Sequence, residues 1–141
     1  MGVILGIDLG KKRVGIAIAD EETKIATPHA TLEIKSRNDL RDQVTALVSE
    51  FGVTRIIVGL PKTMKGEIGI AAQEVVNLVD WLKTQIETDW AFWDERLSTK
   101  EVERILMDAS LDARKRRGIQ DRLAAQRILQ GYLDHKRSTE Q

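Results

Sequence analysis

The strongest constraint on the fold is a pair of strand patterns near the start of the chain. Residues 3–9 form a short apolar run, which is typical of a buried strand. Residues 13–20 alternate larger apolar side chains with glycine and alanine, the period-two pattern of a strand with one face of small residues. Because only residues 10–12 link them, the two strands are predicted to pair in antiparallel orientation. A sheet must therefore form part of the core.

The rest of the sequence alternates segments with helical and strand patterns. A third strand is predicted at residues 25–32, and Pro28 within it favours an edge position. Ser36 or Asn38 is typical of the start of the next helix, and Gly52 of its end. The later segments are, in order, a strand at 54–59, a helix at 72–86, a strand at 90–94, and helices at 98–109 and 121–132. This order predicts an α/β fold in which a mixed five-stranded sheet is flanked by helices.

Composition limits the chemistry that this chain can perform. Its 141 residues fit a single domain, residues 1–141, with a tail from about residue 136 predicted to be disordered. The absence of cysteine excludes thiolate zinc sites and a cysteine nucleophile, and two histidines leave little for a histidine-rich metal site. The 22 basic and 22 acidic residues balance, which excludes a strongly basic sheath around nucleic acid. An enzyme of this composition must rely on carboxylates, lysine or arginine, hydroxyls or a metal.

The sequence also bears on where the protein acts. No apolar run reaches the roughly 18 residues that are needed to cross a membrane. The first residues lack the basic segment that begins a secretory signal. We therefore expect a cytoplasmic protein with no membrane partner.

Acidic residues occupy three positions that the predicted fold brings toward one edge of the sheet. Asp8 ends the first strand, and Asp94 and Glu95 follow the last one. Right-handed crossovers make the first, fourth and fifth strands parallel, so their carboxyl ends share the edge at which open α/β sheets bind ligands. Asp121 precedes apolar residues by three, four, seven and eight positions, which places it on the buried face of a helix. Taken alone, the simpler interpretation of Asp121 is an N-cap of that helix.

Carboxylates on separate elements that converge on one point repel each other unless a cation lies between them. Mg²⁺ and Mn²⁺ prefer oxygen ligands and are held by one or two carboxylates together with substrate phosphate. Two such ions about 4 Å apart generate the attacking hydroxide and stabilise the leaving oxygen. The acidic positions therefore predict one or two Mg²⁺ or Mn²⁺ ions and hydrolysis of phosphodiester bonds, a reaction that needs neither histidine nor cysteine.

Basic residues are concentrated beside the acidic ones. Residues 112–137 carry eight basic and three acidic residues, whereas residues 87–108 carry seven acidic and three basic ones. A basic strip next to an acidic pocket suits a polyanion that metals cut, although a solvated surface gives the same pattern. The loop at 62–69 adds lysines and backbone N–H groups that suit a phosphate. The residues expected to contact nucleic acid are Lys11, Lys12, Arg13, Lys62, Lys65, Arg114, Lys115, Arg116 and Arg117.

Four motifs occur in a fixed order along the chain. They are Gly6-Ile7-Asp8-Leu9-Gly10 with Arg13-Val14-Gly15, Gly59-Leu60-Pro61 with Gly66, Asp94-Glu95-Arg96-Leu97-Ser98-Thr99, and Asp121 with Ala124-Ala125 and Ile128-Leu129-Gln130. Together they resemble the YqgF/RuvX family over about residues 3–133. These are small bacterial proteins with an RNase H-like fold, akin to Holliday junction resolvases of the RuvC type. The resemblance therefore implies an RNase H-like fold for this chain.

The resemblance also implies a nuclease assigned to maturation of the 5′ end of pre-16S rRNA. Some members are linked to Holliday junction resolution or to transcription. By position, Asp8, Glu95 and Asp121 resemble the catalytic, metal-binding carboxylates, while Asp94 and Arg96 would orient them. Glu95 is preferred to Asp94 because it takes the resolvase-like place after the strand. The implied cofactor is Mg²⁺ or Mn²⁺, and the implied partners are pre-16S rRNA within ribosomal precursor particles or branched DNA, bound by a monomer or a homodimer.

Two other classes of function stay open at this point. A phosphate-binding module of the actin and sugar kinase type would use residues 6–10 as its first phosphate loop, but such proteins close two domains around ATP and need a longer chain. A non-catalytic RNA-binding factor in ribosome assembly would use the strip at 114–117 alone. Tight binding of ATP would support the first class, and RNA binding without cleavage in any metal would support the second.

Overall fold

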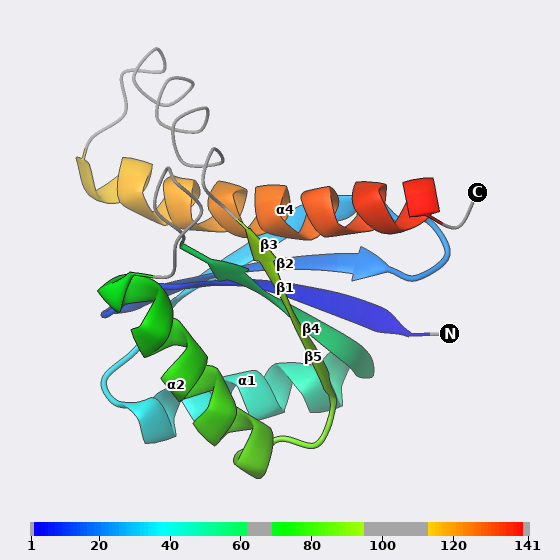
Figure 1. Ribbon diagram of the computed structural model, residues 1–141. Coiled ribbons are helices and arrows are strands. Elements are labelled where there is room, and N and C mark those ends of the chain that lie inside the picture. Colours follow the sequence, from blue (N-terminus) through cyan, green and yellow to red (C-terminus); the bar gives the residue numbers. More distant parts are fainter. Residues whose placement is uncertain (1, 62–68, 95–112, 140–141) are drawn as a thin grey trace.

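The fold is a mixed sheet between two layers of helices. The computed structural model describes residues 2–61, 69–94 and 113–139. Figure 1 labels its elements, which are β1 (Val3–Leu9), β2 (Arg13–Asp20), β3 (Ala26–Glu33), α1 (Arg37–Phe51), β4 (Val53–Leu60), α2 (Ile70–Gln85), β5 (Asp89–Asp94) and α4 (Ala113–Thr139). The predicted strands agree with these bounds to within one or two residues. The predicted loop at 62–69 and helix at 98–109 fall almost wholly outside the described residues.

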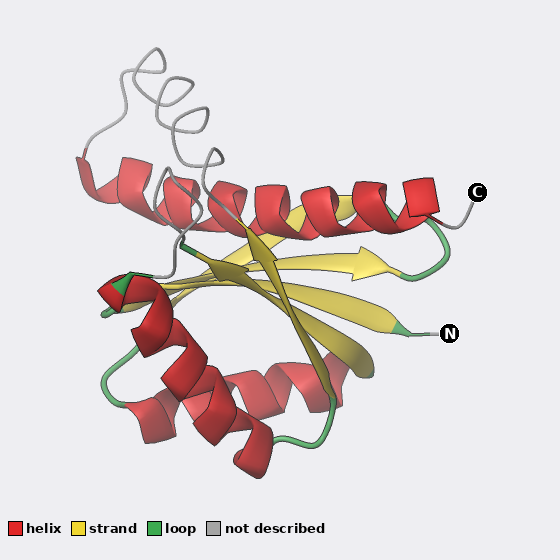
Figure 2. Ribbon diagram, viewed as in Figure 1, coloured by secondary structure: helices red, strands yellow, loops and turns green. Residues whose placement is uncertain are grey.

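The five strands lie in the order β3-β2-β1-β4-β5. Strand β2 is antiparallel to both β1 and β3, whereas β4 is parallel to both β1 and β5. Helix α4 covers one face of this sheet and helices α1 and α2 cover the other, as Figure 2 shows. The predicted α/β class, mixed five-stranded sheet and parallel first, fourth and fifth strands are confirmed. Pro28 lies in β3 at the edge, as predicted.

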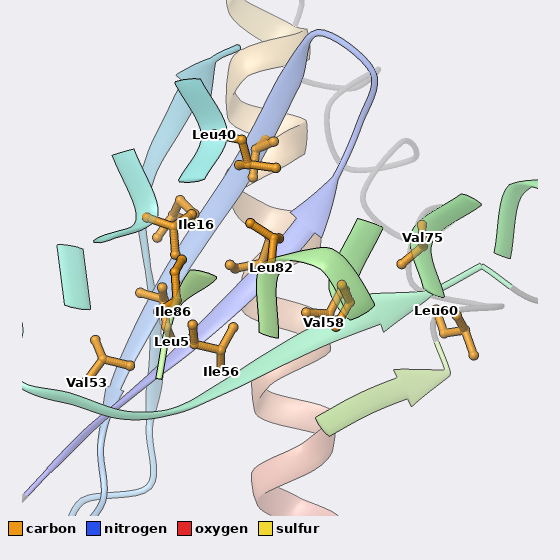
Figure 3. Close-up of a cluster of buried hydrophobic side chains, with 14 of the residues drawn as sticks. Leu5, Ile16, Leu40, Val53, Ile56, Val58, Leu60, Val75, Leu82 and Ile86 are labelled. Carbon is orange, nitrogen blue, oxygen red and sulfur yellow. The ribbon is translucent and has the colours of Figure 1, made fainter. Parts of the chain in front are cut away.

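Large aliphatic side chains fill the layer between the sheet and helices α1 and α2. Successive side chains of a strand point to opposite faces, so alternate residues of each strand enter this layer. Figure 3 shows Leu5, Ile16 and Ile56 of the sheet near Leu40 of α1 and Leu82 of α2, and all five are at most 2% exposed. Full burial of one such side chain contributes about 1.5–3 kcal/mol, so this layer supplies much of the stability of the fold.

Small side chains dominate the other face of the sheet, where α4 packs. Ala17 and Ala19 of β2 are buried there against a row of apolar residues on the helix, namely Ala125, Ile128, Leu129 and Leu133. Gly6 of β1 also lies under the helix, because a Cβ atom there would come within 2.7 Å of the Leu129 Cβ. The alternation of large and small residues in β2 therefore sorts its two faces between the two helical layers.

The two ends of α1 follow the signals in the sequence. Ser36 is the N-cap of α1, and its side chain accepts a hydrogen bond from the backbone N–H of Asp39 at 3.1 Å. Gly52 ends α1 with φ at 66°, in the left-handed region that favours glycine. Helix α4 continues to Thr139, so part of the tail predicted to be disordered is helical in the structure. No helix in the described segments is long and apolar enough to cross a membrane.

Candidate functional site

The candidate site lies where β1 ends beneath the first half of α4. Asp8 is the penultimate residue of β1 and is half-buried. The two residues before it on the same face of the strand, Ile4 and Gly6, pack against α4. Because side chains alternate along a strand, Asp8 is directed toward α4 and its neighbour Leu9 toward the opposite layer. The sequence prediction that Asp8 lies at the carboxyl edge of the sheet is confirmed.

Gly15 joins the surroundings of Asp8 to those of Asp121. It is the residue opposite Asp8 in the antiparallel pair of β1 and β2. A Cβ atom at Gly15 would overlap the backbone carbonyl of Asp121 and lie 3.1 Å from its Cα. Opposite residues of antiparallel strands have Cα atoms about 4.5–5.5 Å apart, so the Cα atoms of Asp8 and Asp121 lie within about 10 Å of each other. Two aspartate side chains can reach one ion across such a span.

Asp121 is an interior residue of a long helix. Helix α4 begins at Ala113, so Asp121 lies eight residues beyond its first residue. The N-cap interpretation of Asp121 is therefore wrong, whereas its predicted place on the buried face is confirmed by its contact with Gly15. The helix starts earlier than the apolar spacing suggests, because residues 113–117 consist of alanine, lysine and arginine, which are good helix formers without an apolar stripe.

Arg13 is the cationic partner of Asp121. Its Nε donates a hydrogen bond to the Asp121 Oδ2 at 2.8 Å, and the two side chains are 38% and 19% exposed. Arg13 starts β2 and, like Gly15, faces α4, so the same strand face supplies both the room for the helix and the charge for its carboxylate. Sequence analysis named Arg13 as a nucleic-acid contact but missed this ion pair, since 108 residues separate the two side chains.

Glutamines of α4 fix the helix to the outer strand. Gln130 accepts a hydrogen bond from the backbone N–H of Ala26 at 2.8 Å, and the Gln126 amide donates to the carbonyl of Ala26 at 3.0 Å. Nearer the site, the Thr31 hydroxyl donates to the backbone carbonyl of Gly118 at 2.6 Å. These contacts set the register of α4 along the sheet, and this register determines where Asp121 lies relative to the strands. Sequence analysis did not identify them, because glutamine and threonine carry no pattern that predicts a partner.

The end of β5 places Asp94 on the face of the sheet opposite Asp8. Trp90 and Phe92 pack with the layer of α1 and α2, whereas Ala91 and Trp93 pack with that of α4. Alternation therefore places Asp94 on the α1 and α2 side, opposite the face that carries Asp8. Glu95 and Arg96 lie outside the described residues. The structure thus brings together Asp8 and Asp121 and assigns Asp94 to the other face.

The predicted basic contacts lie partly within the described residues. Lys11 and Lys12 are exposed in the turn between β1 and β2, next to Asp8 in the chain. Residues 114–117 belong to the first turns of α4, near the same edge in Figure 1, and their side chains lie outside the described part. Lys62 and Lys65 also lie outside it. The exposed Lys11 and Lys12 follow the end of the strand that carries Asp8, which favours an anionic ligand at this edge of the sheet.

The donor set suits a hard divalent cation. Among the described residues, no group of three or more histidine, cysteine, aspartate or glutamate side chains is placed to hold a metal ion. Two carboxylates on facing elements are nevertheless the oxygen ligands that Mg²⁺ accepts together with water and phosphate. In the structure, Arg13 supplies the positive charge beside Asp121. The described pair thus fits part of the predicted metal site.

Comparisons with known proteins agree over nearly the whole chain. The family model RuvX, described as Holliday junction resolvase, matches residues 2–135. A protein of Desulforudis audaxviator named "Putative pre-16S rRNA nuclease" is 40% identical over 136 residues, which cover 96% of both chains. A protein of Bacillus cytotoxicus with the same name is 41% identical over 135 residues, which cover 94% of this chain and 98% of that one.

Solved structures of resolvases share the fold. RuvC of T. thermophilus, solved in complex with a Holliday junction substrate, superposes with a TM-score of 0.59 at 13% identity and covers 99% of this chain and 98% of that one. The Fowlpox virus resolvase, solved with Holliday junction DNA, gives a TM-score of 0.58 at 10% identity over 94% of this chain and 97% of that one. At such identities the likeness shows the fold alone, and the predicted RNase H-like architecture of the RuvC type is confirmed.

Proposed function

Since the chain belongs to the RuvX family, we propose that it is a nuclease that hydrolyses phosphodiester bonds at the edge where Asp8 and Asp121 meet. The observation that carries this proposal is the contact of Gly15 with both residues, because it seats the helix that bears Asp121 directly on the strand beside Asp8. Two carboxylates separated by 113 positions of sequence approach each other there; Arg13 compensates the charge of Asp121, and a divalent ion between the two would offset the repulsion that remains. The match of the family model to almost the whole chain favours a nuclease over a kinase-type phosphate module.

We assign the catalytic and metal-binding roles to Asp8, Glu95 and Asp121. Glu95 follows β5 directly, and the side of the sheet occupied by Asp94 supports choosing Glu95 as the third ligand. One or two Mg²⁺ or Mn²⁺ ions, when bound, would supply an activated water and stabilise the leaving oxygen. Arg13 holds the Asp121 carboxylate through Oδ2 and so orients it toward the strand. Arg96 would help to orient the site, whereas Asp94 faces the layer of α1 and α2 and is not given that role.

We propose the 5′ region of pre-16S rRNA, in the cytoplasm and within ribosomal precursor particles, as the substrate. Relatives about 40% identical over nearly their full length carry the name "Putative pre-16S rRNA nuclease". Exposed Lys11 and Lys12 beside Asp8, with Lys62, Lys65 and residues 114–117, would bind the phosphate backbone. We further propose that residues 1–141 act as one domain, as a monomer or a homodimer.

Branched DNA is the second candidate substrate. The description of the family model and the likeness to a RuvC structure that contains a Holliday junction favour it. The same carboxylate pair would serve either substrate, because the reaction at the phosphate is the same. A comparison of precursor-like RNA with a four-way DNA junction therefore decides between them.

Substitution of Asp8 tests the catalytic site. Asp8→Asn keeps the shape of the side chain and removes one ligand charge, so cleavage in Mg²⁺ or Mn²⁺ should fall at least 100-fold, about 3 kcal/mol of transition-state stabilisation. Asp80→Asn, at an exposed position of α2, removes the same charge far from the site and should leave the rate unchanged. Cleavage of labelled RNA and of labelled junctions is followed on gels, with the melting temperature measured for each variant.

Three results separate the alternatives. Equal rates for wild type and Asp8→Asn would show that the assigned carboxylate is not catalytic. RNA binding without cleavage in either metal would favour a non-catalytic assembly factor. Cleavage of the junction alone would move the substrate from RNA to branched DNA.

A further inference from the structure

A cavity of about 360 Å³ opens at the carboxyl end of β1, on the opposite face of the sheet from Asp8. Its walls come from the end of β1, the segment that leads from β3 into α1, and the start of α2. Figure 1 shows the beginnings of α1 and α2 on the side of the molecule where β1 ends. The cavity is thus continuous with the edge that carries the proposed active site, yet none of its lining residues belongs to the assigned carboxylates.

The floor of the cavity is apolar. Leu40 of α1 and Val75 of α2 are 2% and 9% exposed and close it from below, and Leu9, Ile34 and Leu78 form its walls. Small-molecule sites in proteins usually begin at about 300 Å³ and present mainly apolar side chains with a few polar groups. A cavity of this size and lining suits one flat, weakly polar ring system.

The rim of the cavity is predominantly cationic. Lys11, Lys35 and Arg37 are exposed and line its mouth, and Glu74 is the acidic residue among the lining groups. An apolar floor beneath a cationic rim matches a molecule that is flat and apolar at one end and anionic at the other. A nucleotide within a nucleic acid strand has this combination, because its base is a flat ring and its phosphate carries the charge.

The position of β1 links this cavity to the carboxylates. Asp8 faces α4 and the next residue, Leu9, lines the cavity on the other face. A strand of nucleic acid that crosses the end of β1 can therefore present a phosphate to Asp8 while an adjacent base turns into the cavity. A base that is stacked and paired in a duplex cannot make this turn without being extruded, which costs a few kcal/mol.

We propose that this cavity is a binding site for an unpaired nucleobase next to the phosphate that is cut. The inference rests on the proposed nuclease function and narrows its substrate class to single-stranded or splayed segments. Apolar contacts with Leu9, Leu40 and Val75 hold the base, and Lys11 and Lys35 contact the flanking phosphates. Specificity then depends on strand structure near the cut more than on a particular base.

Ala71 offers a way to fill the cavity without disturbing the core. It lines the cavity but is exposed on α2, so Ala71→Phe places a ring in the mouth and displaces no buried side chain. Gln73→Phe adds the same ring at an exposed position of the same helix that does not line the cavity. The two variants add the same ring to exposed positions of one helix, inside and outside the cavity. Gln73→Phe also removes an exposed hydrogen bond from the Gln73 amide to the Asn77 Oδ1, at 3.0 Å, so the two melting temperatures should be similar.

Binding is measured in EDTA, by fluorescence anisotropy, with a labelled 12-nucleotide single-stranded RNA. A second strand that lacks its central bases and a 12-base-pair RNA duplex serve as comparisons. The wild type and Gln73→Phe should bind the intact strand about 10-fold more tightly than either comparison, since one bound base contributes about 1–3 kcal/mol. Ala71→Phe should bind all three equally. Equal affinities of the wild type for intact, abasic and duplex RNA, or an Ala71→Phe variant that still prefers the intact strand, would overturn the inference.

Cleavage of the same single strand in Mg²⁺ distinguishes this inference from the proposed function. Base-dependent binding without cleavage by the wild type would overturn the nuclease assignment and leave the base site in place. Cleavage by the wild type with no difference between Ala71→Phe and Gln73→Phe would overturn the base site and leave the nuclease assignment in place. Where both hold, Ala71→Phe should raise KM about 10-fold and change kcat little.

Discussion

The two faces of the sheet are built on different principles. The face under α1 and α2 presents large aliphatic side chains such as Leu5, Ile16 and Ile56. The face under α4 presents Gly6, Gly15 and small alanines, and polar contacts from the helix reach the strands. On the first face, large side chains hold the helices away from the sheet and stabilise the fold through the apolar area that they bury. On the second face, the backbone of α4 lies close to the strands, so the position of the helix is fixed more narrowly.

The candidate catalytic carboxylates, Asp8 and Asp121, lie on the face with the smaller core. A carboxylate on a helix can be positioned against one on a strand only if helix and strand cannot slide past each other. Where a helix carbonyl lies directly against a strand glycine, no side chain between them can change its rotamer, so the two backbones themselves set the distance. The close packing of α4 therefore has a role in the geometry of the site beyond its contribution to stability.

The largest expected loss of stability comes from the α1 and α2 face. Ile56→Ala removes a fully buried side chain from the large core and should lower the free energy of unfolding by about 2–5 kcal/mol. Cleavage by the folded protein should change little, because α4 keeps its place. Urea denaturation measures the first quantity and single-turnover cleavage the second. A loss below about 1 kcal/mol would contradict the division of labour between the two faces.

A smaller loss of stability with a larger loss of activity is expected at Gly15. Gly15→Ala drives a methyl group into the Asp121 carbonyl, so α4 must lift, at a cost of about 1–3 kcal/mol. Cleavage should fall with it, since Asp8 and Asp121 move apart. Gly118→Ala is the matched control, because among the described residues a Cβ there meets nothing closer than 4.0 Å and alanine favours a helix by about 0.5–1 kcal/mol. Denaturation and cleavage that respond alike to both substitutions would argue against close packing as the cause.

The smallest expected effect on stability is at Arg13. Arg13→Gln removes a partly exposed ion pair and should cost about 1 kcal/mol or less. Arg41→Gln breaks an Nε-to-carboxylate contact of 3.0 Å with Asp42, remote from the site, and provides the comparison. Cleavage should fall for Arg13→Gln alone, and mainly in kcat, because the Asp121 carboxylate loses its orienting partner. Equal cleavage rates for the two variants would show that Arg13 does not orient the Asp121 carboxylate for catalysis.

Most of the fold could be predicted because local patterns and simple topology rules determine it. A short apolar run predicts β1, period-two alternation predicts β2, a serine and a glycine mark the ends of α1, and right-handed crossovers place Asp8 at the carboxyl edge. The start of α4 was misplaced because lysine and arginine favour a helix without marking its face. Its first eight residues therefore fall outside the predicted helix, and Asp121 resembles a cap.

The candidate site could be predicted only in part, because its contacts are long-range. The buried position of Asp121 followed from helical spacing, but its ion pair with Arg13 and its contact with Gly15 depend on how α4 is seated. The structure shows that Gly15 gives the backbone of Asp121 room to approach β2. The shared metal site of Asp8, Glu95 and Asp121 stays a prediction, since Glu95 lies outside the described residues.

The glutamines that hold α4 to β3 have an effect beyond the register of the helix. An outer strand normally offers unpaired backbone groups on which the strand of another molecule can add. Gln126 and Gln130 occupy both the N–H and the carbonyl of Ala26, where β3 begins. At Ala26 the edge strand therefore offers no unpaired backbone group to the strand of another molecule, and replacing both glutamines by alanine would expose these two groups.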